Sequence, residues 1–387
     1  MDEYVLMDRR PQHLYMHVPF CSGKCSYCAF YSEPYGSARA ERYLDALERE
    51  LAPWTDVAAG GCATLYIGGG TPSLLSGAQW SRLFGILAPV TAGGVGEWTV
   101  EANPGTLSAE RLTALAAAGV NRISLGVQAL DDAVLSALQR RHRVADVAPS
   151  VALVREAGIA NVGLDLIAGL PGVEDAHWRD TLAQAIALMP DHVSVYALGV
   201  EPGTRLAQQA ACGAVRLPAD SAVMRALDIA ASVLADAGLE SYEISNYARA
   251  GRQSLHNLAC WRGGDYLGLG PAAASRVGRE RWTNAPDLAA YCAALEAGAP
   301  PPREHEPVDA ETDLLERLLF RFRLAEGVPV ADCCAEAGPV GEALWLRWQP
   351  ELERLQNEGV LIAADRRWFT TVRGREVLDS ILERLMP

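Results

Sequence analysis

Short apolar segments alternate with helical segments through the first two thirds of this 387-residue chain. Six of these segments have the length and residue types of β-strands, and they lie at residues 13–18, 63–68, 97–101, 121–126, 161–167 and 192–197. The segments between them, such as 108–118 and 177–188, are rich in alanine and leucine. This alternation is typical of a parallel sheet covered by helices. Six units are fewer than a closed eight-stranded barrel needs, so the sequence predicts an α/β fold with a partial (β/α)6 TIM-type barrel.

The pattern changes after about residue 240, which suggests a division of the chain into three parts. We predict a core over residues 1–240, an extension of the core over 241–300, and a C-terminal domain over 301–387. The C-terminal domain contains predicted helices and one predicted hairpin, the composition of a small α+β winged-helix-like module, and the proline-rich residues 297–307 are expected to form a linker before it. From residue 303 onward there are 11 arginines, no lysine and 17 Asp or Glu, so DNA binding by this domain is disfavoured.

Composition excludes several other classes of protein. Half of the residues are hydrophobic (50%) and 21% are charged, so the chain is expected to fold. The formal charge of −14 argues against a nucleic-acid partner. Residues 1–10 lack the apolar region of a signal peptide, and no run of 18 apolar residues predicts a transmembrane segment, so we expect a cytoplasmic protein. The nine cysteines are irregularly spaced, which argues against a disulfide scaffold.

Three cysteines, Cys21, Cys25 and Cys28, directly follow the first predicted strand. Such a short loop cannot bury three structural thiols, so we interpret it as a metal centre. Structural zinc needs four ligands, and His13 or His17 would have to supply the fourth. A [4Fe–4S] cluster held by three cysteines leaves one iron without a protein ligand. That iron can be chelated by S-adenosylmethionine, whose C–S bond is cleaved by one electron to give a 5′-deoxyadenosyl radical.

Polar residues at the ends of other predicted strands suit the same cofactor. Glycines at positions 68–70 let the backbone approach a ligand closely, and Thr71 adds a hydroxyl. Glu101 can accept hydrogen bonds from both ribose hydroxyls, and the guanidinium fork of Arg140 matches the cofactor carboxylate. Further contacts are offered by Gln128 and Asp165. Each residue alone could cap a helix, but several at one edge of a sheet indicate a ligand site.

Together these motifs resemble the radical S-adenosylmethionine superfamily, and within it the branch of oxygen-independent coproporphyrinogen III oxidase and its relatives. The resemblance covers nearly the whole chain and includes the segments GGGTP at 68–72, EANP at 101–104, SLGVQ at 124–128, DLIAGLP at 165–171 and GLGP at 268–271. The resemblance implies that the cluster is bound by Cys21, Cys25 and Cys28. It also implies that S-adenosylmethionine is contacted by Tyr15, Gly69, Gly70, Thr71, Glu101, Gln128, Arg140 and Asp165.

Within this branch, the oxidase and its sister group differ in the number of cysteines in the cluster loop and in the length of the chain before that loop. The oxidase has a fourth cysteine two residues after the third, where this chain has Phe30. The oxidase also has a long N-terminal extension, whereas 20 residues precede the first cysteine here. Both differences favour the HemW heme chaperones, which bind heme and hand it to acceptor proteins. Residues 256–261 resemble the His-Asn-x-x-Tyr-Trp motif of that group, with Cys260 in place of tyrosine, so the resemblance implies that His256 takes part in heme binding.

Three hypotheses for the function follow. The first is a cytoplasmic radical S-adenosylmethionine protein with one [4Fe–4S] cluster that acts as a heme chaperone, with heme and heme-acceptor proteins as partners and with a homodimer left open. The second is an enzyme that oxidatively decarboxylates two propionates of coproporphyrinogen III. The third is a zinc-stabilised structural or regulatory protein.

Six residues near or outside these motifs allow further interpretations. Lys24, the only lysine of the chain, either stabilises the negative charge of the cluster or is a solvated loop residue. The cysteines without ligand spacing are interpreted as small buried residues. They are Cys62, Cys212, Cys292, Cys333 and Cys334.

Overall fold

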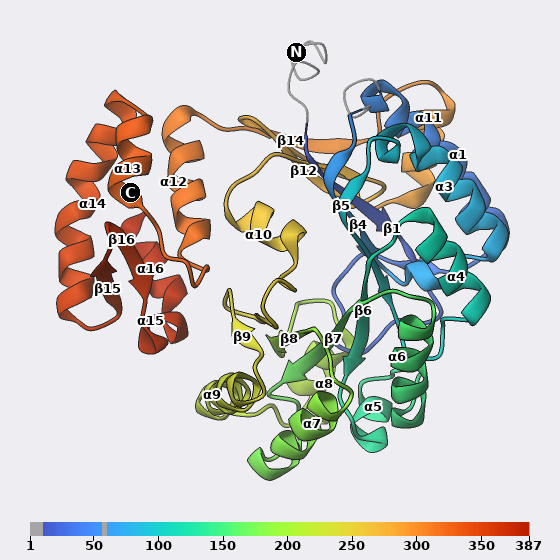
Figure 1. Cartoon of the computed structure of the whole chain (residues 1–387), viewed down its shortest axis with the longest axis horizontal. Coiled ribbons are helices and arrows are strands. Elements are labelled where there is room, and N and C mark those ends of the chain that lie inside the picture. Colours follow the sequence, from blue (N-terminus) through green and yellow to red (C-terminus); the bar gives the residue numbers. More distant parts are fainter. Residues whose placement is uncertain (1–10, 56–59, 387) are drawn as a thin grey trace.

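The computed structural model describes residues 11–55 and 60–386 (Figure 1). The expectation that residues 1–10 are not a signal peptide concerns residues outside these ranges. Among the described residues, no helix combines the length and apolar character that crossing a membrane requires.

A twelve-stranded sheet forms the main body, and the six strands predicted from the sequence lie together within it. They are β1 (His13–Val18), β4 (Cys62–Gly69), β5 (Val95–Ala102), β6 (Arg122–Gln128), β7 (Asn161–Ala168) and β8 (His192–Ala197). Each pairs in parallel with the next in this order. The predicted partial (β/α)6 barrel is therefore confirmed, and the carboxyl ends of these strands meet at one edge.

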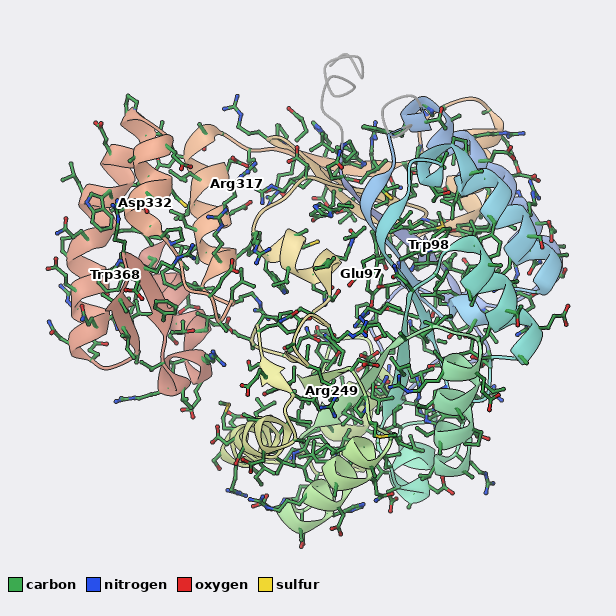
Figure 2. All side chains as sticks on the ribbon, viewed as in Figure 1. Glu97, Trp98, Arg249, Arg317, Asp332 and Trp368 are labelled. Carbon is green, nitrogen blue, oxygen red and sulfur yellow. The ribbon has the colours of Figure 1, made fainter. Side chains whose placement is uncertain are left out.

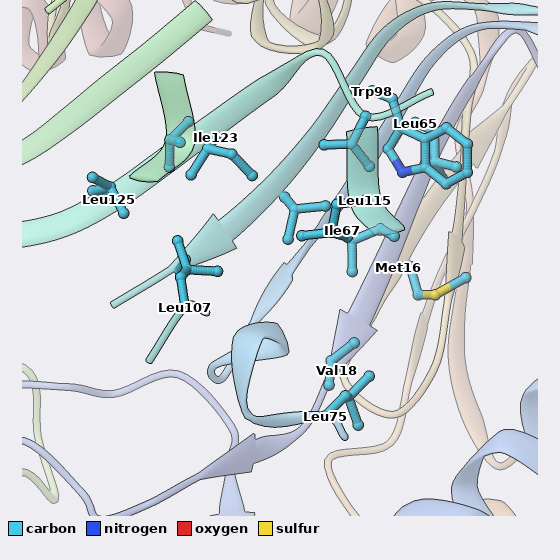
Figure 3. Packing of buried hydrophobic residues seen from close by; sticks show 14 of the residues in the cluster. Met16, Val18, Leu65, Ile67, Leu75, Trp98, Leu107, Leu115, Ile123 and Leu125 are labelled. Atoms are coloured by element: carbon cyan, nitrogen blue, oxygen red, sulfur yellow. The ribbon is translucent and has the colours of Figure 1, made fainter. Parts of the chain in front are cut away.

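Helices cover the outer face of these strands (Figure 1). They include α1 (Ser37–Leu51), α3 (Gly77–Thr91), α4 (Ala109–Ala118), α6 (Val147–Glu156), α7 (Asp175–Ala187) and α9 (Asp220–Asp236). On β4, Leu65 and Ile67 belong to the buried apolar cluster that also contains Leu115 of α4 (Figure 3). Because side chains alternate along a strand, Thr64 and Tyr66 point to the opposite face, into the barrel. The inner face of the barrel is therefore free to carry polar residues.

Further strands extend the sheet on both sides. Next to β1 lies the parallel strand β11 (Tyr266–Leu269), followed by the antiparallel strands β12 (Ala274–Val277), β13 (Glu280–Asn284) and β14 (Arg303–Pro307). Next to β8 lie β10 (Asn246–Ala248) and β9 (Glu240–Ser241).

The prediction of a linker at 297–307 is wrong for its last five residues, because these form β14, an edge strand of the sheet. Its charged side chains pair across the edge with those of β13. Arg281 lies 2.8 Å from Glu306, and His305 lies 2.8 Å from Glu280. Charged residues are common on edge strands because they face water and discourage pairing with other chains.

The C-terminal part has a hydrophobic core of its own, which includes Phe322, Trp348 and Leu352. Its elements are α12 (Ala310–Arg321), α13 (Val330–Glu336), α14 (Pro339–Asn357), the hairpin β15 (Leu361–Ala364) and β16 (Arg367–Thr370), α15 (Val372–Glu376) and α16 (Leu378–Leu385). This arrangement agrees with the predicted winged-helix-like module. Figure 2 shows Trp368 in this part and Trp98 in the barrel. The domain boundaries at residues 240 and 300 stay predictions.

A short helix, α10 (Leu255–Trp261), lies between the barrel and the C-terminal part (Figure 1). On the C-terminal side, the Arg323 guanidinium lies 4.3 Å from the centre of the Trp261 ring. The Trp261 ring also lies 6.1 Å from the Phe320 ring, and Arg262 donates two hydrogen bonds to Glu326. The helix that carries the expected heme motif therefore contacts both parts of the molecule.

Candidate functional site

A cavity of about 580 Å³ opens at the carboxyl ends of the parallel strands, the edge where ligands of α/β barrels bind. Ten residues expected from the sequence line it. They are Cys21, Cys25, Cys28, Gly69, Gly70, Thr71, Glu101, Gln128, Arg140 and Asp165. Tyr15 and His256 are not among the lining residues.

The three cysteines border the cavity as free thiols. Cys21 Sγ lies 3.6 Å from Thr71 Oγ1, and Arg140 Nη1 donates a hydrogen bond to Cys25 Sγ over 3.5 Å. Within residues 11–55 and 60–386, no three His, Cys, Asp or Glu side chains are grouped to hold one metal ion. All three thiols lie at the edge of this one cavity, where each could bind a separate iron of a cluster.

The loop that carries the cysteines is closed by Lys24. Its ammonium group donates hydrogen bonds to the Phe30 carbonyl and, over 3.4 Å, to Ser32 Oγ. Burial raises the pKa of the Cys28 thiol, and the charge of Lys24 opposes this rise. Lys24 therefore both ties the loop and favours the thiolate form of Cys28. Phe30, at the position where the oxidase has a cysteine, is 71% exposed at the cavity.

The glycines at the end of β4 and directly after it pack so closely against their neighbours that a side chain would clash. A Cβ atom on Gly70 would lie 2.6 Å from the Phe20 carbonyl oxygen, and one on Gly68 would lie 2.8 Å from the Glu101 carboxyl carbon. Gly69 has a φ of +103°, a conformation that favours glycine. Gly69 and Gly70 line the cavity, and their N–H groups donate to Glu101 Oε2 over 3.2 Å and to the Val18 carbonyl over 2.9 Å, so the turn is held in place and presents no side chain to a ligand.

Glu101 projects from the inner face of β5 and is held by two donors. Tyr66 donates its hydroxyl to Oε1 over 2.8 Å, and the Gly69 N–H donates to Oε2 over 3.2 Å. Burial raises the pKa of Glu101 to about 7, although these two hydrogen bonds oppose the rise. A carboxylate has about four lone-pair positions, so each oxygen can accept one more hydrogen bond. Glu101 can therefore receive two neighbouring hydroxyl groups, such as those of a ribose.

Arg140 reaches into the cavity between the cysteine loop and β6. Its Nη2 donates to Asn103 Oδ1 over 2.5 Å and to the Gly126 carbonyl, and Asn103 Nδ2 donates to Thr71 Oγ1 over 3.0 Å. Arg140 Nε is buried and has no hydrogen-bond partner among the described residues. Because Arg140 lines the cavity, its positive charge favours an anionic ligand such as a carboxylate.

Gln128 and Asp165 complete this wall of the cavity. The register between β6 and β7 is irregular between Gly126 and Gln128, and Gln128 has a φ of +67°. Asp165 accepts hydrogen bonds from Ser124 over 3.1 Å and from Ser194 over 2.7 Å. Burial raises the pKa of Asp165, and the two serine hydroxyls oppose this rise.

The structure places His256 below the cavity, inside the barrel, where it is 6% exposed. His256 Nδ1 lies 2.8 Å from Thr64 Oγ1, and its ring lies 5.2 Å from the Tyr66 ring. Burial lowers the pKa of His256 to about 3, so the imidazole is neutral. Tyr15 lies nearby, with its hydroxyl 3.1 Å from His17 Nδ1 and its ring 6.1 Å from Tyr66.

The first turn of α10 is anchored to the barrel by Glu97 of β5. Its carboxylate accepts hydrogen bonds from Ser254 Oγ over 3.2 Å, Leu255 N–H over 2.9 Å and His256 N–H over 3.1 Å. At the other end of α10, burial raises the pKa of the Cys260 thiol to about 12. Cys260, which stands where the motif has tyrosine, is therefore a neutral thiol and a poor thiolate ligand at neutral pH.

Sequence reasoning missed several polar residues on the inner strand faces. They are Thr64, Tyr66, Glu97, Arg122, Ser124 and Ser194. Their spacing in the sequence could have indicated them, because polar residues two or four positions apart in a strand lie on the same face. Two of the remaining cysteines also differ from expectation. Cys212 is exposed at the end of α8 (Arg205–Ala211), and Cys333 is only partly buried, whereas the other three are buried as expected.

The fold and the cavity define a class of protein: a partial barrel with three cysteines and a glycine-rich turn at the carboxyl ends of its strands. The family model described as the radical SAM superfamily matches residues 15–185, and the model described as the HemN C-terminal domain matches residues 308–377. A solved structure, coproporphyrinogen III oxidase (HemN) from Escherichia coli, has a TM-score of 0.85 with 24% identity and covers 100% of this chain and 93% of its own. This likeness shows the shared fold.

Curated relatives narrow the class further. Heme chaperone HemW from Bacillus subtilis is 36% identical, over 81% of this chain and 84% of the relative. HemW from Escherichia coli is 34% identical, over 96% and 97%, and HemW from Mycobacterium tuberculosis is 33% identical, over 98% and 96%. The chain therefore belongs to the HemW family of radical SAM proteins related to oxygen-independent coproporphyrinogen III oxidase. Membership of the radical SAM superfamily implies a [4Fe–4S] cluster and S-adenosylmethionine.

Proposed function

We propose that this protein is a heme chaperone, which binds heme and transfers it to acceptor proteins. The observation that carries the proposal is the similarity along nearly the whole chain to relatives named HemW heme chaperones. The proposal includes action in the cytoplasm and leaves a homodimer open. Oxidation of coproporphyrinogen III is the alternative outcome of the experiment below.

The cluster would be held by Cys21, Cys25 and Cys28. All three are free thiols at one cavity, and Arg140 and Lys24 supply positive charge beside them. When bound, the cluster would supply the electron that cleaves the C–S bond of S-adenosylmethionine. The protein's own residues bind, orient and shield these groups.

S-adenosylmethionine would occupy the remainder of the cavity. Gly69 and Gly70 line the cavity and would let its methionine part approach the backbone closely, Glu101 would accept its ribose hydroxyls, and Arg140 would pair with its carboxylate. Further contacts are assigned to Tyr15, Thr71, Gln128 and Asp165. Tyr15 does not line the cavity, and its ring lies 6.1 Å from the ring of Tyr66, which does.

Heme would be bound through His256. A neutral imidazole is a good ligand for heme iron, and an imidazole in contact with water is mostly neutral above about pH 7. His256 is 6% exposed and its Nδ1 lies 2.8 Å from Thr64 Oγ1, so there is little room for a porphyrin while α10 packs against β4. We therefore assign heme binding to an open state in which α10 has separated from β4, and we call the structure described here the closed state.

Heme titration of the anaerobically reconstituted protein tests this function. The wild-type protein is expected to give a saturable Soret shift with one heme per chain, and His256→Ala is expected to weaken heme binding while retaining the cluster absorbance. His177→Ala, on the surface of α7, is the matched control and should bind heme normally. A wild-type protein that gave no Soret shift and instead converted coproporphyrinogen III would contradict the proposal.

A further inference from the structure

Tyr66 contacts both the cofactor cavity and the buried histidine of α10. We propose that Tyr66 couples the two sites, so that S-adenosylmethionine in the cavity weakens heme binding at His256. The inference rests on the proposed function, since it assigns a regulation to the same heme site. In this scheme the cofactor promotes heme release, and heme promotes cofactor release.

The geometry of β4 makes Tyr66 a bridge. Its hydroxyl lines the cavity and donates to Glu101 Oε1 over 2.8 Å. Its ring lies 5.2 Å from the His256 ring at an interplanar angle of 37°, a packing contact between aromatic faces. Thr64, two residues earlier on the same strand face, bonds the same histidine. One rigid strand therefore carries the contacts to both sites.

The direction of the coupling follows from what stabilises the closed state. In that state Glu101 is held in place by Tyr66 and by the Gly69 N–H, and is thus preorganised for a ribose. The His256 ring packs against the Tyr66 ring and thereby helps to hold the Tyr66 hydroxyl on Glu101, so a nucleoside ligand that binds Glu101 gains from this order only while α10 is in place. Heme requires the open state, in which this contact is lost. A ligand that favours the closed state must therefore weaken heme binding, and linkage makes the effect reciprocal.

A second connection between the sites runs through charged groups, whose substitution would also change the stability of the fold. Glu97 anchors α10. Arg122 lines the cavity, is 2% exposed and interacts electrostatically with Glu97 and Asp165. Removing either charge would leave the other uncompensated inside the barrel and would destabilise the fold. Tyr66→Phe removes one hydroxyl and keeps the ring against His256, so it isolates the hydrogen bond.

The experiment measures the dissociation constant of heme with and without saturating S-adenosylmethionine, on protein with an oxidised cluster so that the cofactor is not cleaved. For the wild-type protein, the dissociation constant of heme is expected to be at least about fivefold higher with S-adenosylmethionine than without it, the lower end of typical allosteric coupling. Tyr66→Phe should reduce the ratio to below about twofold while retaining the Soret spectrum of the heme complex. Calorimetric titration of the cofactor, with and without heme, should give the same factor.

Tyr196→Phe is the matched control, because Tyr196 also lines the cavity but makes no ring contact with His256 among the described residues. It should keep the wild-type ratio. The coupling would be contradicted if S-adenosylmethionine did not change the heme affinity of the wild-type protein, or if Tyr66→Phe kept the wild-type ratio of heme dissociation constants. Neither result would contradict the chaperone function. A wild-type protein that binds no heme would overturn the proposed function itself, and the coupling with it.

Discussion

Glu97 Oε1 accepts the backbone N–H of His256 over 3.1 Å, although the two residues are 159 positions apart in the chain. The same carboxylate accepts the N–H of Leu255 and the hydroxyl of Ser254. The first N–H groups of a helix have no partner within the helix, so they are usually satisfied by a side chain that directly precedes it. Here Ser254 accepts the Asn257 N–H in this way, and a strand of the barrel supplies the acceptor for Leu255 and His256, so the position of α10 depends on β5.

Replacing Glu97 with alanine is therefore expected to destabilise the protein and to release α10. Three donors would lose a common buried acceptor, each at a cost of about 1–3 kcal/mol if it stays buried. We expect the free energy of unfolding, measured with urea, to fall by about 3 kcal/mol. Glu311→Ala, which removes an exposed partner of Arg347, should change it by less than about 0.5 kcal/mol. Equal stability of the two variants would show that Glu97 does not anchor the helix.

The cysteine assignment predicts that Cys25→Ala abolishes the cluster. Cys25 borders the cavity and receives a hydrogen bond from Arg140, so its thiolate would be one of three irreplaceable ligands. Iron and sulfide content after anaerobic reconstitution should fall to near background. Cys62→Ala is the control: this buried thiol lies at the start of β4, outside the cavity lining, and its loss should leave iron content unchanged. A variant at position 62 that lost the cluster as completely would contradict the assignment.

The glycine turn predicts a steric effect at Gly70. A Cβ atom there would meet the Phe20 carbonyl oxygen at 2.6 Å and the Phe20 nitrogen at 2.8 Å, and backbone atoms cannot give way as a flexible side chain can. Gly70→Ala should therefore displace the turn, weaken S-adenosylmethionine binding at least tenfold, and cost about 1–3 kcal/mol of stability. Gly77→Ala, where a Cβ atom would meet nothing within 4 Å, should bind the cofactor like wild type. Calorimetric titration distinguishes the two.

The barrel and most of its cavity could be predicted from the sequence because both follow from local rules. Strand and helix alternate with clear periodicity, and in a parallel sheet the residues in and just after the carboxyl-terminal halves of the strands lie toward one edge. Cys21, Glu101 and Asp165 therefore converge whatever the details of packing. The turn at Gly69 is equally local, since its conformation favours glycine in any fold.

The position of His256 could not be predicted, because it depends on contacts between distant segments. Nothing in residues 255–261 indicates that Glu97 will cap the helix, or that Thr64 and Tyr66 will enclose the imidazole. β14 was missed for a similar reason. Its charges resemble those of a linker until Arg281 and Glu280 on the neighbouring strand provide partners of opposite charge or hydrogen-bonding character.

Cofactor binding is expected to depend on pH through Glu101. Burial raises the pKa of this carboxyl to about 7, and only the ionised form can accept hydrogen bonds from both ribose hydroxyls with both of its oxygens. As the pH falls through 7 the group becomes protonated, so the affinity for S-adenosylmethionine should fall about tenfold between pH 8 and pH 6. Glu101→Gln should bind weakly at both pH values, with a difference of less than about twofold.

The matched control for this titration is Glu296→Gln, since Glu296 lies on the surface at the end of α11 (Leu288–Glu296) and pairs with Arg42. It should reproduce the wild-type pH dependence. Calorimetric titrations of the reconstituted protein at constant ionic strength provide the measurement, because salt would otherwise change the interactions of exposed charges. If the wild-type affinity stayed constant between pH 6 and pH 8, or if the same decline persisted in Glu101→Gln, another group would be responsible and Glu101 would not be the ribose acceptor.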